Sequence, residues 1–267
     1  MKRIQLFEFE DLPWFPHALR VRMTRFIVPL HRLMRTPQAI APLLARALEH
    51  SGERAIFDLC SGSCGPMLQA MPEVWRQPGL QDVTLTFSDL YPQREHADEV
   101  RAIADARLRY LEQPVDATAP GEDARGVRTM MCSLHHMPPP LAKQILARAR
   151  TDRAPFLAFE ISDNSLPRWL WWAAMPSTFL MTFLLTPWIR PMTWQQLAWT
   201  YVVPILPALV AWDGAVSNAR TYTLDDLDTL LADLHGPGYR WEKGTLGGFG
   251  PTKQLYLLGL PTDEETP

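Results

Sequence analysis

The spacing of apolar residues changes along the chain. Between residues 17 and 50, apolar side chains such as Leu19, Met23 and Phe26 recur three or four positions apart, which predicts helices. From residue 55 onward, short continuous apolar runs replace this spacing, and such runs are typical of strands buried on both faces. They predict five strands, at residues 55–60, 83–87, 107–111, 127–132 and 156–161.

Helices are expected between these strands, at about residues 66–76, 93–105 and 139–150. Strands that alternate with helices indicate an α/β fold with a parallel sheet covered on both faces. A further helix is predicted at about 223–234, with Thr223 as its N-cap. Two last strands, at 239–246 and 254–260, flank the glycine-rich segment 247–251, which indicates an antiparallel hairpin that closes the sheet.

Composition narrows the class of protein. With 267 residues, 47% of them apolar, the chain suits one large domain or one domain with an insertion, and disorder is excluded. A net charge of −3 argues against binding to nucleic acid. Three cysteines are too few for a disulfide framework, and residues 1–16 lack the apolar core of a secretory signal. A cytoplasmic protein, or one associated with a membrane, is therefore expected.

Candidate ligand-binding residues follow the first three strands. Asp58 begins a turn of small residues, with Cys60 and Gly62 in it, that leads into a helix, so backbone N–H groups there could approach a ligand. Asp89 at the end of the second strand could accept hydrogen bonds from ribose hydroxyls, and Asp116 after the third could meet an adenine amino group. Each position also has an ordinary explanation as a turn or helix cap. No metal site is predicted, because no second ligand pair accompanies the cysteines.

Two adjacent histidines follow the fourth strand. Ser133, His135 and His136 lie where open α/β sheets bind ligands, at the carboxyl ends of the strands. The histidines could act as a base, hold a substrate or form half of a metal site, and a structural role for either is the alternative.

Together these segments resemble the class I S-adenosylmethionine-dependent methyltransferases, over about residues 52–163 and again at the hairpin 239–260. The resemblance implies a Rossmann-like, seven-stranded, mostly parallel sheet and methyl transfer from the sulfonium of S-adenosyl-L-methionine. Cys60 and Cys64 stand where the family usually has glycines. The residues that the resemblance assigns to the cofactor are Asp58, Cys60, Gly62, Asp89, Leu90, Asp116, Ala117 and Ser133. An NAD(P)-dependent oxidoreductase and a non-catalytic binding protein on the same fold remain as alternatives.

Methyl transfer is a direct displacement, so a general base is needed only when the acceptor is protonated. His135 and His136 are the first candidates for that base, and Tyr222 is a weaker one.

Seven of the ten tryptophans lie between Trp169 and Trp212, in a segment whose only charge is Arg190. The uncharged stretches on either side, of 21 and 22 residues, are long enough to cross a bilayer, but prolines and polar residues interrupt them. Three interpretations stay open: a helical lid over a substrate pocket, a lid that also contacts a membrane, and a spanning hairpin. A bulky, apolar acceptor is expected in each case.

The predicted organisation has three parts. Residues 1–50 form an N-terminal helical cover, residues 51–164 and 213–262 form the cofactor-binding domain, and residues 165–212 form the apolar lid between strands five and six. The polar segment 213–222 either lines the mouth of the pocket or is a solvated connector. Substrate contacts are expected from Trp14, Trp172 and Arg220. The sequence does not predict the identity of the acceptor, the atom that is methylated or the oligomeric state.

Overall fold

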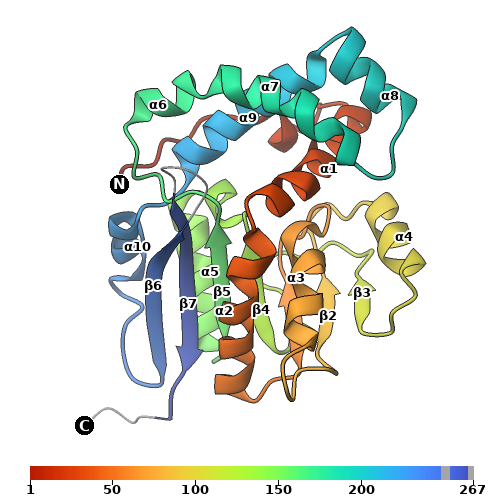
Figure 1. Cartoon of the computed structure of the whole chain (residues 1–267). Coiled ribbons are helices and arrows are strands. Elements are labelled where there is room, and N and C mark those ends of the chain that lie inside the picture. The colour runs from red at the N-terminus through yellow and green to blue at the C-terminus, as the bar shows by residue number, and fades with distance from the viewer. Residues whose placement is uncertain (248–252, 264–267) are drawn as a thin grey trace.

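A seven-stranded sheet runs through the molecule in the order β3-β2-β1-β4-β5-β7-β6 (Figure 1). The computed structural model describes residues 1–247 and 253–263. Strands β1 to β5 pair in parallel, whereas β7 is antiparallel to both β5 and β6. The strands are β1 (Ala55–Asp58), β2 (Thr84–Phe87), β3 (Leu108–Tyr110), β4 (Val127–Met131), β5 (Phe156–Glu160), β6 (Tyr239–Gly247) and β7 (Lys253–Pro261).

This topology confirms the predicted fold class, and every predicted strand is present within two residues at each end. All residues of β4 and β5 are buried, as expected for central strands covered on both faces. The buried charge of Arg128 in β4 is compensated by Asp152, 2.7 Å away. The turn of the hairpin, at 248–252, lies outside the described residues.

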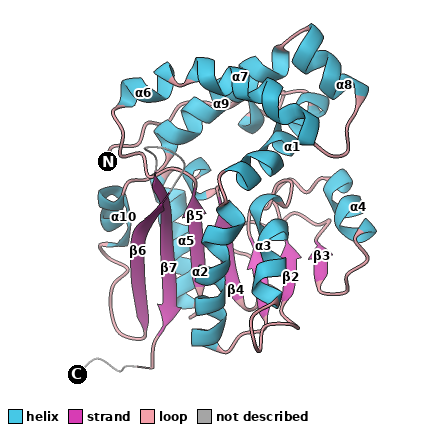
Figure 2. Ribbon diagram, viewed as in Figure 1, coloured by secondary structure: helices cyan, strands magenta, loops and turns pink. Residues whose placement is uncertain are grey.

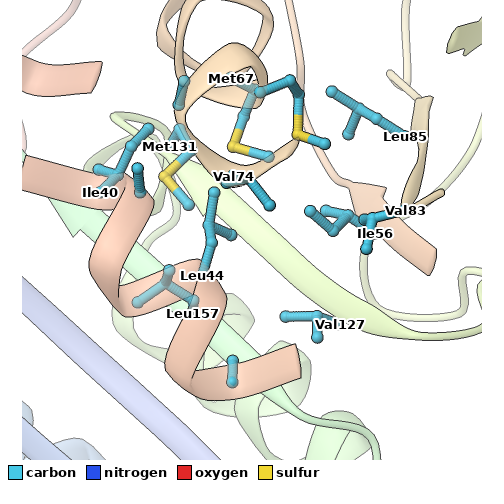
Figure 3. Close-up of a cluster of buried hydrophobic side chains, with 14 of the residues drawn as sticks. Ile40, Leu44, Ile56, Met67, Val74, Val83, Leu85, Val127, Met131 and Leu157 are labelled. Carbon is cyan, nitrogen blue, oxygen red and sulfur yellow. The ribbon is translucent and has the colours of Figure 1, made fainter. Parts of the chain in front are cut away.

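Helices cover both faces of the sheet. On one face lie α2 (Thr36–Ser51), α3 (Gly65–Trp75) and α4 (Arg94–Ala102), whose apolar side chains join those of the strands in one cluster. Figure 3 shows Leu44 of α2 and Met67 and Val74 of α3 converging above the sheet. On the other face lie α5 (Pro139–Thr151) and α10 (Leu224–Leu231). The predicted cap of α10 is confirmed, because the Thr223 side chain accepts a hydrogen bond from the N–H of Asp226.

A second layer, entirely helical, lies beyond one end of the sheet (Figures 1 and 2). It contains α1 (His17–Leu33), α6 (Arg168–Ala173), α7 (Met175–Leu185), α8 (Trp194–Leu197) and α9 (Ile205–Arg220), with the short turns η1 (Phe9–Asp11), η3 (Thr186–Trp188) and η4 (Ala198–Val202). Met23 and Phe26 of α1 share an apolar cluster with Leu206 and Val210 of α9. The N-terminal segment and the tryptophan-rich segment therefore pack against each other.

One predicted boundary is wrong. Residues 205–220 form a single helix, so the boundary at 212 falls inside α9, and residues 213–220 are not a solvated connector. The physical reason is that Ala215, Val216 and Ala219 continue the buried face of the helix, while Asp213 is buried with partners of its own. Within the described residues, no single helix is long and apolar enough to cross a membrane. The two segments Trp194–Val202 and Ile205–Arg220, which meet at an angle of 81°, reach that length and apolar composition only when taken together.

Candidate active site

The turn after β1 has an unusual backbone. Cys60, Gly62 and Cys64 have φ values of 55°, 48° and 63°, in the left-handed region that glycine adopts most easily. A Cβ on Gly62 would meet no atom within 4 Å, so the backbone there faces open space. Burial raises the pKa of both thiols, which disfavours the thiolate that a metal would need.

Asp58, at the end of β1, is buried and holds neighbouring strands together. Its carboxylate accepts a hydrogen bond from the hydroxyl of Thr129 in β4, and its carbonyl oxygen accepts one from Ser61 and one from Ser88. Burial raises the pKa of Asp58 to about 7. The structure therefore gives Asp58 a role in positioning the turn.

Asp89 joins the turn after β1 to the end of β2. One carboxylate oxygen accepts the N–H of Gly62 at 3.0 Å, and the other accepts the N–H of Tyr91 at 2.9 Å. A carboxylate offers about four acceptor positions, so this arrangement leaves capacity for a diol. The adjacent Leu90 is exposed.

Asp116 lies in the loop after β3, and its carboxylate accepts hydrogen bonds from the N–H and hydroxyl of Thr118. The neighbouring Ala117 is buried. Burial raises the pKa of the Cys60 thiol, and the negative charges of Asp89, Asp58 and Asp116 add to this effect, so the three predicted acids lie in the neighbourhood of this side chain.

His135 forms a buried pair with Glu160. The short turn η2 (Leu134–His136) places His135 beside the end of β5. There the Glu160 carboxylate accepts the backbone N–H of His135 at 3.1 Å and forms a hydrogen bond of 2.8 Å with its Nδ1. The opposite ring nitrogen, Nε2, has no hydrogen-bond partner within the described residues. Sequence reasoning missed Glu160, although an acid that ends an apolar strand next to the strand of His135 was a usable signal.

His136 has a different environment. Its Nδ1 lies 3.1 Å from Asp11 and 3.3 Å from Glu8, and Arg220 contacts the same two carboxylates at 2.6 and 3.0 Å. Burial opposes protonation, but the charge of Glu8 and the hydrogen bond to Asp11 outweigh it and raise the pKa of His136 to about 9. His136 therefore keeps its proton at neutral pH and is not available as a base.

Glu8, His135 and His136 each offer a ligand atom within 4.8 Å of the other two, which is a spacing that a metal ion could use. The positive charge of Arg220, 3.0 Å from Glu8, already neutralises this carboxylate and opposes a metal there.

Three further predictions do not agree with the geometry. Tyr222 donates its hydroxyl to the Met137 carbonyl at 2.6 Å, and burial raises its pKa to about 12, so it is not placed to act as a base. Arg220 forms ion pairs with Glu8 and Asp11. Neither Arg220 nor Tyr222 lines the cavity that lies between the helical layer and the ends of β4 and β5. Trp14 is 70% exposed and also lies outside the cavity.

A cavity of about 460 Å³ lies between the helical layer and the ends of β4 and β5. Its volume suits a small molecule. Trp171 lines it, whereas the predicted Trp172 packs against Trp212 with ring centroids 5.9 Å apart. The rest of the wall includes Met23, Phe26, Leu30, Met181, Val210, Cys132, His135, Glu160, Glu8, Glu10 and Asp213. The cavity therefore combines an apolar wall with a polar end that contains His135 and Glu160.

Comparisons with known proteins agree with the fold. No family model and no curated protein matches the chain. Among solved structures, an O-methyltransferase family protein from Burkholderia thailandensis has a TM-score of 0.51 and 14% identity, over 93% of this chain and 62% of the other. Human N-acetylserotonin methyltransferase in complex with SAM has a TM-score of 0.46 and 15% identity, over 84% of this chain and 52% of the other.

The chain thus spans less than two thirds of the length of these structures. The fold that the two layers define is the class I methyltransferase fold, as the sequence predicts.

Proposed function

We propose that the protein is an S-adenosylmethionine-dependent methyltransferase that methylates an oxygen atom of an apolar small molecule. The observation that carries this proposal is the buried His135–Glu160 pair, which lines a cavity and in which the buried Nε2 of His135 has no partner within the described residues. Cys132 connects the cavity with the candidate cofactor residues, because it lines the cavity and its thiol is also influenced by the charge of Asp58.

The candidate cofactor residues suit an adenosine ligand. Asp89 would accept hydrogen bonds from the ribose hydroxyls, Asp116 would accept one from the adenine amino group, and the backbone of Gly62 faces open space. The hydroxyl of Ser133 is buried and has no partner within the described residues, which is the state expected of a group that hydrogen-bonds a ligand. When bound, S-adenosylmethionine supplies the electrophilic methyl group.

His135 is oriented to remove a proton from the acceptor. If Nδ1 donates its hydrogen to Glu160, the lone pair of Nε2 is free to accept a proton, and the carboxylate then stabilises the resulting imidazolium. An acceptor with an O–H group, such as a phenol, uses such a base, whereas a neutral amine attacks the methyl group without one. The geometry therefore favours methylation at oxygen.

Two measurements test this proposal. Calorimetry should show that S-adenosylhomocysteine binds the wild type and that Asp89→Ala weakens binding by about 10- to 100-fold, the equivalent of one or two charge-assisted hydrogen bonds. The exposed Asp82→Ala is the matched control and should bind normally. Binding of NADH in place of S-adenosylhomocysteine would instead indicate an oxidoreductase.

Methyl transfer from labelled S-adenosylmethionine to a panel of lipophilic phenols is the second measurement. His135→Gln should lose turnover and keep cofactor binding, and substitution of the exposed His17 by Gln should change neither. Normal binding without turnover of any acceptor would favour the non-catalytic alternative.

We also propose that the outer face of the helical layer rests on a lipid surface. Ten large apolar side chains between residues 169 and 205 are exposed, among them Trp188 at 62% and Trp194 at 71%. No acidic residue lies between Asp163 and Asp213, so nothing in this segment repels an anionic headgroup. Tryptophan prefers the interface between headgroups and acyl chains.

Flotation with phosphatidylcholine vesicles that contain phosphatidylglycerol tests this contact. The wild type should float with the vesicles, and the double variant Trp188→Ser/Trp194→Ser should not. Trp14→Ser removes an equally exposed tryptophan that lies outside the tryptophan-rich segment and should leave flotation unchanged. A wild type that stays at the bottom of the gradient would refute the proposal.

A further inference from the structure

The polar end of the cavity is acidic. Four carboxylates line it, from Glu8, Glu10, Glu160 and Asp213, and among the described residues no lysine or arginine does. The protonated His136 also lines it but is paired with Glu8 and Asp11. Two of the four carboxylates already have cationic or N–H partners: Glu8 contacts Arg220, and Glu160 accepts the backbone N–H of His135 and lies 2.8 Å from its Nδ1.

Glu10 and Asp213 have no such cationic partner. Within the described residues, neither forms an ion pair, and the side chain of Glu10 accepts no hydrogen bond. The carboxylate of Asp213 accepts the backbone N–H groups of Phe9, at 2.9 Å, and of Glu10, at 3.2 Å. Burial and mutual repulsion raise the pKa of Glu10 to about 8, and burial raises that of Asp213 to about 7. A cation placed between the two carboxylates would offset both the cost of their burial and the repulsion between their charges.

A second polar group in the same cavity also lacks a partner. The Nε2 atom of His135 is buried and unpaired within the described part of the chain, and the residue is 5% exposed. Between these polar groups the wall is apolar, with Phe26, Trp171 and Val210 in it. The cavity is therefore built for a ligand with an apolar body and two different polar ends.

We propose that the methyl acceptor is a lipophilic amine that also carries a hydroxyl group, and that Glu10 and Asp213 bind its ammonium while His135 faces the hydroxyl. This inference rests on the proposed methyltransferase function, because it assigns the acceptor of that same site. An anionic acceptor would face Glu10 and Asp213, because the cation of His136 is already paired with Glu8 and Asp11. A neutral acceptor would provide no counterion for the ionised forms of Glu10 and Asp213. The ammonium is the anchor and not the nucleophile, since its nitrogen has no lone pair.

The test is a binding experiment on protein saturated with S-adenosylhomocysteine, so that the amino group of the cofactor is already in place. The probes are tyramine, its neutral analogue 4-propylphenol and the acid 3-(4-hydroxyphenyl)propanoate, which share one ring and differ in the charge of the chain. Tyramine should bind at least about tenfold more tightly than 4-propylphenol, and the acid should bind most weakly, because a charge-assisted hydrogen bond contributes about 1.5–3 kcal/mol.

Two variants test whether Glu10 and Asp213 cause the preference for tyramine over 4-propylphenol. Glu10→Gln and Asp213→Asn should each remove most of the preference for tyramine while leaving the affinity for 4-propylphenol within about twofold. The matched control is Glu49→Gln, because Glu49 is exposed on α2 and does not line the cavity. Since Asp213 also holds backbone N–H groups, Glu10→Gln is the decisive variant if Asp213→Asn unfolds.

Two results would overturn the inference. One is equal binding of tyramine and 4-propylphenol to the wild type. The other is a Glu10→Gln variant that weakens S-adenosylhomocysteine instead of tyramine, which would assign the acids to the cofactor. Failure of the proposed function has a separate signature, because S-adenosylhomocysteine would then not bind the wild type at all.

Discussion

The raised pKa of Glu10 predicts how stability depends on pH in the protein without ligand. Between pH 4.5 and about 8, the folded state holds a proton on Glu10 that the unfolded state has released. Stability attributable to this group is therefore complete at low pH and is lost as the pH rises through this range. Glu10→Gln removes the titration and should abolish that part of the loss.

The size of the effect follows from the shift. A pKa that rises from 4.5 to about 8 corresponds to about 5 kcal/mol as an upper limit. Glu10 is only partly buried, so water and small rearrangements reduce the cost, and about 2 kcal/mol is the expected gain of the variant at high pH. For a chain of this length, this gain amounts to about 4–8 °C in Tm.

Urea or thermal unfolding at about pH 5 and about pH 9 measures the difference. Glu10→Gln and the wild type should be equally stable within about 0.5 kcal/mol at the lower pH, and the variant should be more stable at the higher pH. Comparison with the wild type at each pH cancels the titration of groups that do not interact with Glu10. His136, whose raised pKa also lowers stability as the pH increases from 6.5 to about 9, titrates in both proteins. A difference that is the same at both pH values would refute the reasoning.

Three further changes test the packing by thermal or urea unfolding. Leu44→Ala should cost about 2–5 kcal/mol, because this side chain is fully buried at the centre of one cluster. Gly126→Ala should cost more than Gly121→Ala, since both have a positive φ but only at Gly126 would the Cβ lie 2.0 Å from a carbonyl oxygen of β1, and equal losses would contradict this contact. Arg220→Met should cost about 3–5 kcal/mol by removing the closer of the two cationic partners of the buried Glu8, and a stable variant that only binds the acceptor poorly would instead favour a substrate role.

The fold could be predicted because its signals are local. The run 156–160 is apolar at every position but the last, and this pattern is typical of a strand that is buried on both faces. Thr223 and Asp226 mark the start of a helix within four residues. The end of the lid was less predictable. Its composition becomes polar at Asp213, but the helix continues because the buried positions of its second half still follow the helical period.

The candidate site was predictable only in part, because many of its contacts join distant segments. Asp89 and Gly62 are brought together by the order of parallel strands, which the sequence pattern predicts. In contrast, Asp11 meets Arg220 across 209 residues, and no periodicity signals such a pair. The same is true of Glu10 and Asp213, which approach each other only because the N-terminal segment lies along α9.

The adjacent histidines show most clearly what the sequence leaves open. Both follow the same strand, and both are candidate bases by residue type. Because they are consecutive residues of the helical turn η2, their side chains point in different directions and meet different neighbours. His135 lines the cavity with Glu160 at its Nδ1, and its buried Nε2 has no partner within the described residues. His136 shares two carboxylates with Arg220 and already holds its proton, so it fastens the N-terminal segment over the site. The environment of His135 is thus set by Glu160, and that of His136 by Glu8 and Asp11, which lie more than a hundred residues away in the chain.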